Sequence, residues 1–503
     1  MQEQNYDIVV VGAGLGGLLS AALLSKEGYK VCVLEKNKQI GGCLQSFGFD
    51  KKLFESAVHY IGSLDKGQTL YKIFTYLGLM DKLALKRLDI DCFDEIILKD
   101  KRYCLAQGHE LFAETMGSCF PKEEENINAY VKEMKRVCEH FPMYNMTFGN
   151  VDDKRKAGLA GLREKLNSFT ENTLLTHVLT GNNLLHGGNF EHTPFYMHAL
   201  IENSYIESSW KCADGSTQIA RLLQEEIIRN GGRVLRNIEV VSMKEENGAM
   251  TYIEDRNGER FFAKQFISNL HPQVTYRLIE SSLIRPVTIK RVASLKNTMS
   301  SFMVNISLKP QMIRYLNHNI YYHKTEDAWE DVHEQILSSP SSFGIFFNED
   351  REHSGFATSI SILTWLHADA SNEWKDTFRT TSARESRGER YEDFKRQRIE
   401  EIIHETAQVI PGLKNAVQKA DACTPLTFRD YLDTPDGSMY GLQKDIRFMT
   451  ESVIATRTKI PNLFLTGQNV NLHGVLGVSI TAVMTVGDLV GLEYLVGKIN
   501  AAQ

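Results

Sequence analysis

The chain has 503 residues, of which 42% are hydrophobic and 24% are charged, and its formal net charge is −6. This length predicts a sizeable core divided into two domains, and the acidic balance, without a zinc finger or other reading motif, argues against a nucleic-acid partner. The eight cysteines form no CxxC pair and are too sparse for a disulfide-rich or zinc-bound fold, so we expect no metal site and a reducing cytosol.

Residues 6–35 are predicted to form a strand, a glycine turn, a helix and a second strand. Residues 6–11 are an apolar, β-branched run typical of a parallel strand buried on both faces. The turn follows as Gly12-Ala13-Gly14-Leu15-Gly16-Gly17. In such a turn the first glycine allows the tight bend, the second admits a pyrophosphate to the backbone, and the last lets the helix approach the strand. The helix extends to about Gly28, and its N-terminus favours an anionic ligand.

The second strand ends at Glu35. A carboxylate there accepts hydrogen bonds from both hydroxyls of an adenosine ribose and repels a 2′-phosphate. The strand, turn, helix, second strand and acid follow in order and at the right spacing, so we predict a site for a dinucleotide that lacks a 2′-phosphate. A purely structural turn is the weaker alternative. This unit alone does not separate NAD from FAD.

The next segment separates the two cofactors. Lys36 and a short loop lead to a second glycine pair, Gly41-Gly42, followed by Cys43 and Ser46. This arrangement resembles the flavoprotein family of amine oxidases and phytoene desaturases, in which it closes over the FAD pyrophosphate and ribityl chain. The resemblance implies an α/β fold with a Rossmann-type FAD-binding domain, an α+β substrate domain, and FAD as the cofactor.

Residues 59–62, His-Tyr-Ile-Gly, resemble a segment of retinol saturases and related carotenoid isomerases that lies beside the flavin. The resemblance makes His59 and Tyr60 the candidates for moving a proton to or from the substrate, because imidazole and phenol groups serve as acid or base when their pKa values are tuned. Packing and hydrogen bonding beside the cofactor is the alternative role for this pair.

The rest of the chain alternates between the two expected domains. Residues 1–69, 210–288 and 458–503 are assigned to the FAD-binding domain, and residues 70–209 and 289–457 to the substrate domain. In the latter, apolar residues at spacings of three and four over 127–141 predict an amphipathic helix. In the former, residues 234–243 are predicted to be one strand, and the family's adenine-contacting valine falls on Val240.

Two segments bear on membranes. Arg379, Arg384, Arg387 and Arg390 are interleaved with acidic residues, which favours a solvated helix face and leaves a peripheral membrane contact as the alternative. Residues 472–496 are apolar but contain His473, Asp488 and Glu493, so we predict a buried helix and not a membrane span. With no signal peptide recognised at the N-terminus, the expected location is cytoplasmic, with that peripheral contact left open.

Near the C-terminus, a strand ends in Gly467-Gln468, and Gly477-Val478 lies in the opening turn of the last helix. Most members of the family have Gly-Asp where this chain has Gly467-Gln468. Gly-Gln matches retinol saturases, which narrows the resemblance to that branch. A helix N-terminus aimed at the flavin would stabilise the negative charge of the reduced ring.

The resemblance implies an FAD-dependent oxidoreductase that saturates or desaturates a C=C bond in a long apolar molecule, such as a carotenoid, a retinoid or a related lipid, by hydride transfer at flavin N5. Isomerisation of a double bond without net redox is the second interpretation, and amine oxidation is the third. From a different class, the Rab-GDP dissociation inhibitors share this fold and bind prenylated proteins without catalysis. No second dinucleotide loop is visible, so electrons are expected from a protein, a quinone or the substrate itself; the electron donor or acceptor and the oligomeric state stay open.

Overall fold

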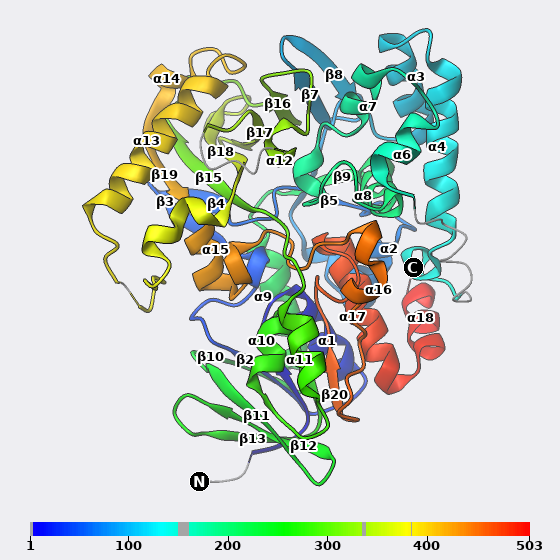
Figure 1. Ribbon diagram of the computed structural model, residues 1–503, viewed down its shortest axis with the longest axis vertical. Helices are drawn as coiled ribbons and strands as arrows, with labels where there is room; N and C mark the ends of the chain where they lie inside the picture. The colour runs from blue at the N-terminus through cyan, green and yellow to red at the C-terminus, as the bar shows by residue number, and fades with distance from the viewer. Residues whose placement is uncertain (1–3, 149–159, 334–338, 384, 503) are drawn as a thin grey trace.

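The computed structural model describes residues 4–148, 160–333, 339–383 and 385–502. Two sheets lie at opposite ends of the long axis of the molecule (Figure 1). The lower sheet has eight strands in the order β10-β2-β1-β13-β12-β11-β14, with β20 paired to β13, and the upper sheet has seven strands in the order β19-β15-β18-β17-β16-β7-β8. Both sheets combine segments that are far apart in the sequence.

The lower sheet contains the predicted strand, turn, helix and strand. Its strands are β1 (Gln4–Val11), β2 (Val31–Glu35), β10 (Arg233–Arg236), β11 (Val240–Glu246), β12 (Ala249–Asp255), β13 (Arg260–Ser268), β14 (Ile279–Glu280) and β20 (Leu463–Leu465). β1 pairs in parallel with β2 and with β13, and β2 pairs in parallel with β10. Every residue of β2 is buried, as expected for a strand covered on both faces.

Helices pack on this sheet through apolar side chains. They are α1 (Leu15–Lys26), α9 (Thr217–Arg229), α17 (Gly474–Val490) and α18 (Leu492–Ala501), with α10 (Pro272–Leu278) and α11 (Pro286–Ala293) near the loops of the same half. Residues 15–25 of α1 are buried on all sides, and α1 packs against both α9 and α17. The predicted helix after the glycine turn is therefore the centre of this core.

Two predicted elements are each divided in the structure. The strand predicted over 234–243 is β10 and β11, because Asn237 has φ of +59° and takes the chain from the edge beside β2 to the meander beside β12. The helix predicted over 472–496 is α17 and α18, because Gly491 has φ of +94° and lies between them. Both breaks use a left-handed backbone conformation, which asparagine and glycine adopt more easily than other residues.

The upper sheet forms the centre of the other half. Its strands are β7 (Asp94–Leu98), β8 (Lys101–Leu105), β15 (Ser300–Leu308), β16 (Asn319–His323), β17 (Ser342–Glu349), β18 (Ala357–Leu366) and β19 (Val417–Cys423). Its helices are α3 (His109–Cys119), α4 (Glu124–Glu139), α6 (Leu162–Asn167), α7 (Thr173–Leu179), α8 (Phe195–Glu207), α12 (Glu330–His333), α13 (Glu389–Thr406) and α14 (Leu413–Ala416). The amphipathic helix predicted over 127–141 is confirmed as α4, which buries Ile127, Tyr130, Met134 and Val137.

Small elements join the two halves. They are β3 (Ser46–Phe49), β4 (Lys52–Glu55), β5 (Ile61–Gly62), β6 (Leu85–Arg87), β9 (Ser209–Cys212), α2 (Thr69–Tyr76), α15 (Pro425–Leu432) and α16 (Met449–Ser452). β5 and β6 both pair with β9. The chain segment that carries His59 and Tyr60 therefore lies directly before this three-stranded connection.

The structure differs from the sequence expectations at the arginine cluster. Arg387 is buried and forms an ion pair with the buried Asp430, whose carboxylate also accepts the Arg379 backbone N–H at 2.8 Å. Arg390 is exposed and pairs with Glu373 at 2.8 Å, while Arg384 lies outside the described residues. A solvated helix face is thus wrong for Arg387, which ties the loop to α15. Within the described ranges, none of the helices is both long and apolar enough to cross a membrane.

One pair of cysteines also departs from expectation. Cys92 and Cys104 form a disulfide. The antiparallel pairing of β7 with β8, in which Glu95 lies opposite Cys104, brings the two thiols together. Disulfides are rare in a reducing cytosol, and the spacing of these two cysteines in the sequence carries no recognisable signature.

Candidate functional site

The glycine turn between β1 and α1 has the tight geometry that the sequence predicts. Gly12 has φ of +93°, a conformation that costs glycine nothing. A Cβ on Gly17 would lie 2.1 Å from the Gly12 carbonyl oxygen, so only glycine lets α1 lie this close to the turn. The exposed N–H groups at the start of a helix are a ready site for an anion.

Glu35, at the end of β2, holds this turn in place. Its Oε2 accepts a hydrogen bond from the Ala13 backbone N–H at 2.9 Å, and its Oε1 accepts one from the Asn37 N–H at 2.8 Å. The residue is 7% exposed, and burial raises the pKa of this carboxyl. Each carboxylate oxygen retains a lone pair for a further donor, so the same group that shapes the turn remains available to a ribose.

A cavity of about 330 Å³, called here the nucleotide cavity, opens beside the turn. Most of the predicted cofactor residues line it: Gly12, Gly14, Leu15, Gly16, Glu35, Lys36, Gly42, Cys43, Val240, Gly467, Gln468 and Val478. These residues come from the first and last segments of the lower half and from β11. The fold therefore brings together sequence motifs that are more than four hundred positions apart.

The other predicted cofactor residues lie elsewhere. Gly41 donates its N–H to the Ala13 carbonyl at 2.7 Å, which joins the two glycine loops, and Ser46 Oγ donates to the Glu55 carboxylate at 3.0 Å. Gly17 packs α1 against the turn, and Gly477 lines a different cavity. None of these four residues, nor Ala13, lines the nucleotide cavity, so they support its wall from behind.

Asn269, directly after β13, is a wall residue that is absent from the predicted cofactor residues. A Cβ on Gly16 would lie 2.5 Å from Asn269 Oδ1 and 3.0 Å from the Gly467 Cα. The Asn269 backbone N–H donates to the Val11 carbonyl at 2.9 Å. Asn269 thus packs between the first glycine turn and the C-terminal Gly467-Gln468 segment. Its signals in the sequence are its place directly after an apolar strand and the resemblance of Ser268-Asn269 to the Ser-Asn strand end of the flavoprotein family.

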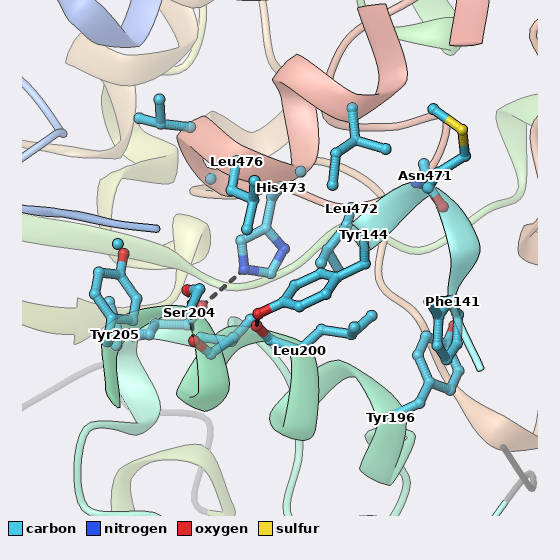
Figure 2. A pocket seen from close by; sticks show the side chains of 18 of the residues that line it. Phe141, Tyr144, Tyr196, Leu200, Ser204, Tyr205, Asn471, Leu472, His473 and Leu476 are labelled. Atoms are coloured by element: carbon cyan, nitrogen blue, oxygen red, sulfur yellow. Dashed lines mark hydrogen bonds between the residues drawn. The ribbon is translucent and has the colours of Figure 1, made fainter. Parts of the chain in front are cut away.

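Two apolar cavities, of about 140 and 100 Å³, continue from the nucleotide cavity. The first shares Cys43 and Gln468 with the nucleotide cavity, and it shares Leu185, Tyr205 and Tyr440 with the second. Figure 2 shows the second cavity, with Tyr205 at one side, Phe141 and Tyr196 at the other, and Tyr144 and His473 between them. Apolar and aromatic side chains dominate both linings, as is typical of sites for apolar ligands.

His59 and Tyr60 both line the first apolar cavity. The His59 ring stacks on Phe346 with 4.0 Å between ring centroids and an interplanar angle of 2°. Burial lowers the pKa of His59 to about 3, and its Nε2 is buried without a hydrogen-bond partner. His59 is therefore neutral near physiological pH.

Tyr60 begins a buried polar chain. Its hydroxyl donates to Asp94 Oδ2 at 2.8 Å and lies 2.8 Å from the Tyr321 hydroxyl. Asp94 also accepts hydrogen bonds from Asn319 Nδ2 at 2.9 Å and from Asn182 Nδ2 at 3.4 Å. Burial raises the pKa of Asp94 to about 7 and raises the pKa of Tyr60 well above its ordinary value. A carboxyl group that exchanges its proton near neutrality thus lies behind a tyrosine at the cavity wall.

Sequence reasoning missed Asp94, Asn182, Asn319 and Tyr321. Asp94 and Asn319 open the paired strands β7 and β16, where they lie opposite each other in register. The only sequence signal is a polar residue at the start of an apolar strand. Nothing in the local pattern indicates that these strands pair with each other.

A second buried cluster adjoins this chain. His186, His198 and Glu202 offer three ligand atoms that all lie within 4.8 Å of one another. Asn182 Nδ2, which donates to Asp94, also donates to Glu202 Oε2 at 3.0 Å. The expectation of no metal site rested on the cysteines alone. The spacing of these two histidines and the glutamate in the sequence matches no metal-binding motif.

Known proteins are similar to this chain in sequence. A family model described as "NAD(P)-binding Rossmann-like domain" matches residues 10–77. The all-trans-retinol 13,14-reductase of Danio rerio is 26% identical over 97% of this chain and 86% of its own length. Prolycopene isomerase 1, chloroplastic, of an Oncidium hybrid cultivar is 23% identical over 100% of this chain and 87% of its own length.

A solved structure agrees with the fold. The CLA-producing fatty acid isomerase from P. acnes matches with a TM-score of 0.62 at 13% identity, over 96% of this chain and 98% of that one. At this identity the likeness concerns the fold alone. The predicted α/β class with a Rossmann-type domain is confirmed.

Proposed function

This chain belongs to the family of retinol saturases, carotenoid isomerases and phytoene desaturases, and from that premise we propose that it is an FAD-dependent oxidoreductase acting on a C=C bond of a long apolar polyene. A retinoid, a carotenoid or a related lipid is the substrate class. The observation that carries the proposal is that the nucleotide cavity shares wall residues with the first apolar cavity, which in turn shares wall residues with the second. A redox cofactor and an apolar chain can therefore meet inside the protein.

The walls of the nucleotide cavity fit FAD. Gly14 and Gly16 leave the backbone free of side chains beside the start of α1, and Glu35 faces the same space, which suits a pyrophosphate and a ribose. Val240 lines this cavity and is the residue proposed for the adenine, while Gln468 and Val478 line both this cavity and the first apolar cavity. Bound there, FAD supplies a ring that accepts or donates hydride.

The apolar cavities fit the substrate. Their shared wall of Leu185, Tyr205 and Tyr440 gives one continuous apolar surface, and burying an apolar chain there is favourable by about 25 cal/mol per Å² of surface removed from water. The protein thereby excludes water from the double bond and holds it beside the cofactor.

Tyr60 is the residue that we propose to hold and move a proton. Saturating a C=C bond requires a proton at one carbon, and forming one requires its removal. Tyr60 and Tyr321 both line the first apolar cavity, and the Tyr60 hydroxyl contacts Asp94 and the Tyr321 hydroxyl. The pKa of Asp94, at about 7, lets that carboxyl resupply or take the proton near neutrality. His59 remains neutral and packs against Phe346.

Isomerisation of a double bond is the second candidate function. It is favoured by the match over the full chain to a protein named prolycopene isomerase. It would use the same cavities and cofactor with no net change in the substrate's hydrogen content. Product analysis separates the two, because saturation changes the substrate mass by two hydrogens and isomerisation does not.

Binding of all-trans-retinol, followed by its fluorescence, tests the substrate class. Leu185→Trp places a larger side chain in the wall shared by both apolar cavities. We therefore expect retinol affinity to fall by about five- to 150-fold, the equivalent of an overpacking cost of about 1–3 kcal/mol, with flavin content unchanged. Ile289→Trp, at an exposed position on α11, is the matched control. Unchanged affinity in the Leu185 variant would remove these cavities from substrate binding.

A further inference from the structure

Two imidazoles and one carboxylate meet behind the wall of the apolar cavities. His186 follows the short helix η4 (Asn183–Leu185), and His198 and Glu202 lie one turn apart on α8, so their side chains share a helix face. His186 Nε2 is 3.0 Å from His198 Nδ1 and 3.6 Å from Glu202 Oε1. His186 and His198 are fully buried, and Glu202 is 1% exposed.

We propose that His186, His198 and Glu202 bind a divalent transition ion, Zn²⁺ or Fe²⁺. Two histidines with one carboxylate form a ligand set that both ions prefer. In a tetrahedral site with bonds of about 2.0–2.2 Å, neighbouring ligand atoms lie roughly 3.3–3.6 Å apart. Two of the three separations, 3.0 and 3.6 Å, lie close to this value, and all three ligand atoms lie within 4.8 Å of one another.

Two of the three ligands have the outer hydrogen bonds of a metal site, whereas His186 Nδ1 is buried without a partner. His198 presents Nδ1 to the cluster, while its Nε2 lies 2.7 Å from the Tyr130 hydroxyl. Asn182 Nδ2 donates to Glu202 Oε2 at 3.0 Å, which leaves Oε1 for the ion. Metal-bound histidines and carboxylates are oriented in this way by hydrogen bonds to their other polar atom.

Without an ion, the cluster has unmet polar groups. Glu202 Oε1 is buried with no hydrogen-bond partner. Among the residues that the structure describes, the His186 imidazole is the only basic group recorded within 4.0 Å of this carboxylate. A buried carboxylate with an unpaired oxygen and no charged partner is costly, and a divalent cation between the three ligand atoms removes that cost. A proton shared by the two imidazoles is the competing arrangement.

The position of the site indicates what the ion would do. It joins η4 to α8, and these two elements contribute Leu185 and Tyr205 to both apolar cavities. Through Asn182 it also reaches Asp94 of the proposed proton chain. The ion would therefore fix the shape of the substrate wall, and its binding is independent of the flavin.

Metal content of the purified, dialysed protein tests the proposal. Plasma mass spectrometry should find about one Zn or Fe per chain, and X-ray absorption at that metal's edge should show only nitrogen and oxygen neighbours at about 2.0–2.2 Å. Glu202→Gln keeps the side-chain shape but removes the anionic ligand, and should lower the content to less than about a tenth of an ion per chain. Glu207→Gln, at the end of the same helix, should retain it.

Chelation gives a second measurement that needs no variant. Treating the wild-type protein with 1,10-phenanthroline should lower its melting temperature, and adding back Zn²⁺ or Fe²⁺ should restore it. If the wild-type chain holds less than about a tenth of an ion after purification and after incubation with both metals, the hydrogen-bonded pair of imidazoles is the correct description. Equal metal content in the Glu202 variant and the wild type would likewise overturn the assignment.

Discussion

The nucleotide cavity and the polar chain behind Tyr60 are built in opposite ways. One side of the first is formed by backbone and by glycines that lie in short motifs, such as residues 12–17 and Gly42. The second is formed by the side chains of Tyr60, Asp94, Asn182, Asn319 and Tyr321, which no single motif contains. A site made of contiguous backbone is visible in the sequence, whereas a site made of dispersed side chains becomes visible only when the strands are paired.

The nucleotide cavity should be disrupted most completely by Gly14→Val. The new side chain would enter the nucleotide cavity, and its Cβ would lie 2.9 Å from Asn269 Nδ2. We expect the purified variant to lose nearly all of its flavin, measured by absorbance near about 450 nm, a general property of oxidised flavins. Gly497→Ala, where a Cβ would meet nothing within 4 Å, is the control. Normal flavin content in the Gly14 variant would remove the turn from the cofactor site.

The polar chain behind Tyr60 should affect how the free energy of unfolding depends on pH. Burial raises the pKa of Asp94 from 3.8 to about 7, so the folded state binds this proton more tightly than the unfolded state. The stability that the group contributes is fully present below about pH 4 and is lost as the pH rises through about 7.

Asp94→Asn, which does not titrate, should remove that dependence. Relative to wild type, its free energy of unfolding should rise by up to about 1.4 kcal/mol per pH unit between about pH 4 and 7. Urea unfolding at several pH values measures this, with the exposed Asp81→Asn as control. Parallel pH curves for the Asp94 variant and the wild type would place its ionisation elsewhere.

Tyr60→Phe separates chemistry from packing. The variant keeps the ring but loses the hydroxyl that contacts Asp94 and Tyr321. If this hydroxyl transfers the proton, the rate of the reaction with substrate should fall about a hundredfold or more, as for loss of a general acid, at unchanged flavin content. Tyr322→Phe, the neighbouring residue on β16 with a 3.4 Å hydrogen bond to Gln408, should retain its rate. A retained rate in the Tyr60 variant would leave that residue a packing role.

The smallest effect is expected for Glu35→Ala. The variant loses the acceptor for the predicted ribose hydroxyls and for the Ala13 and Asn37 N–H groups, which should weaken FAD retention by about 1–3 kcal/mol. Flavin occupancy after extended dialysis measures the loss. Glu254→Ala, at a half-buried ion-pair residue on β12, controls for charge, and equal retention in all three proteins would contradict the role of Glu35.

The sequence allowed the lower half to be predicted well because its signals are local. A buried strand, a glycine turn and Glu35 follow each other within thirty residues of one another, and each has a physical reason for its position. The division of 234–243 into two strands was missed, because Asn237 breaks the strand only through a single left-handed residue. Val240 nevertheless lines the nucleotide cavity.

The upper half was less predictable because its contacts are distant in sequence. Asp94 becomes part of a site only when β7 pairs with β16, and Arg387 becomes buried only when its loop meets α15. The disulfide between Cys92 and Cys104 likewise depends on the pairing of β7 with β8. None of these partners can be chosen from hydrophobic periodicity alone.

An anaerobic titration tests the central claim most directly. The protein purified with its flavin is reduced with one equivalent of dithionite, and the retinoid is then added while absorbance and products are followed. The account predicts that the oxidised flavin spectrum returns and that product two hydrogens heavier than the substrate forms in equal amount. A flavin that stays reduced while only the cis/trans composition of the polyene changes would establish isomerisation instead, and a colourless protein that binds the retinoid unchanged would contradict catalysis altogether.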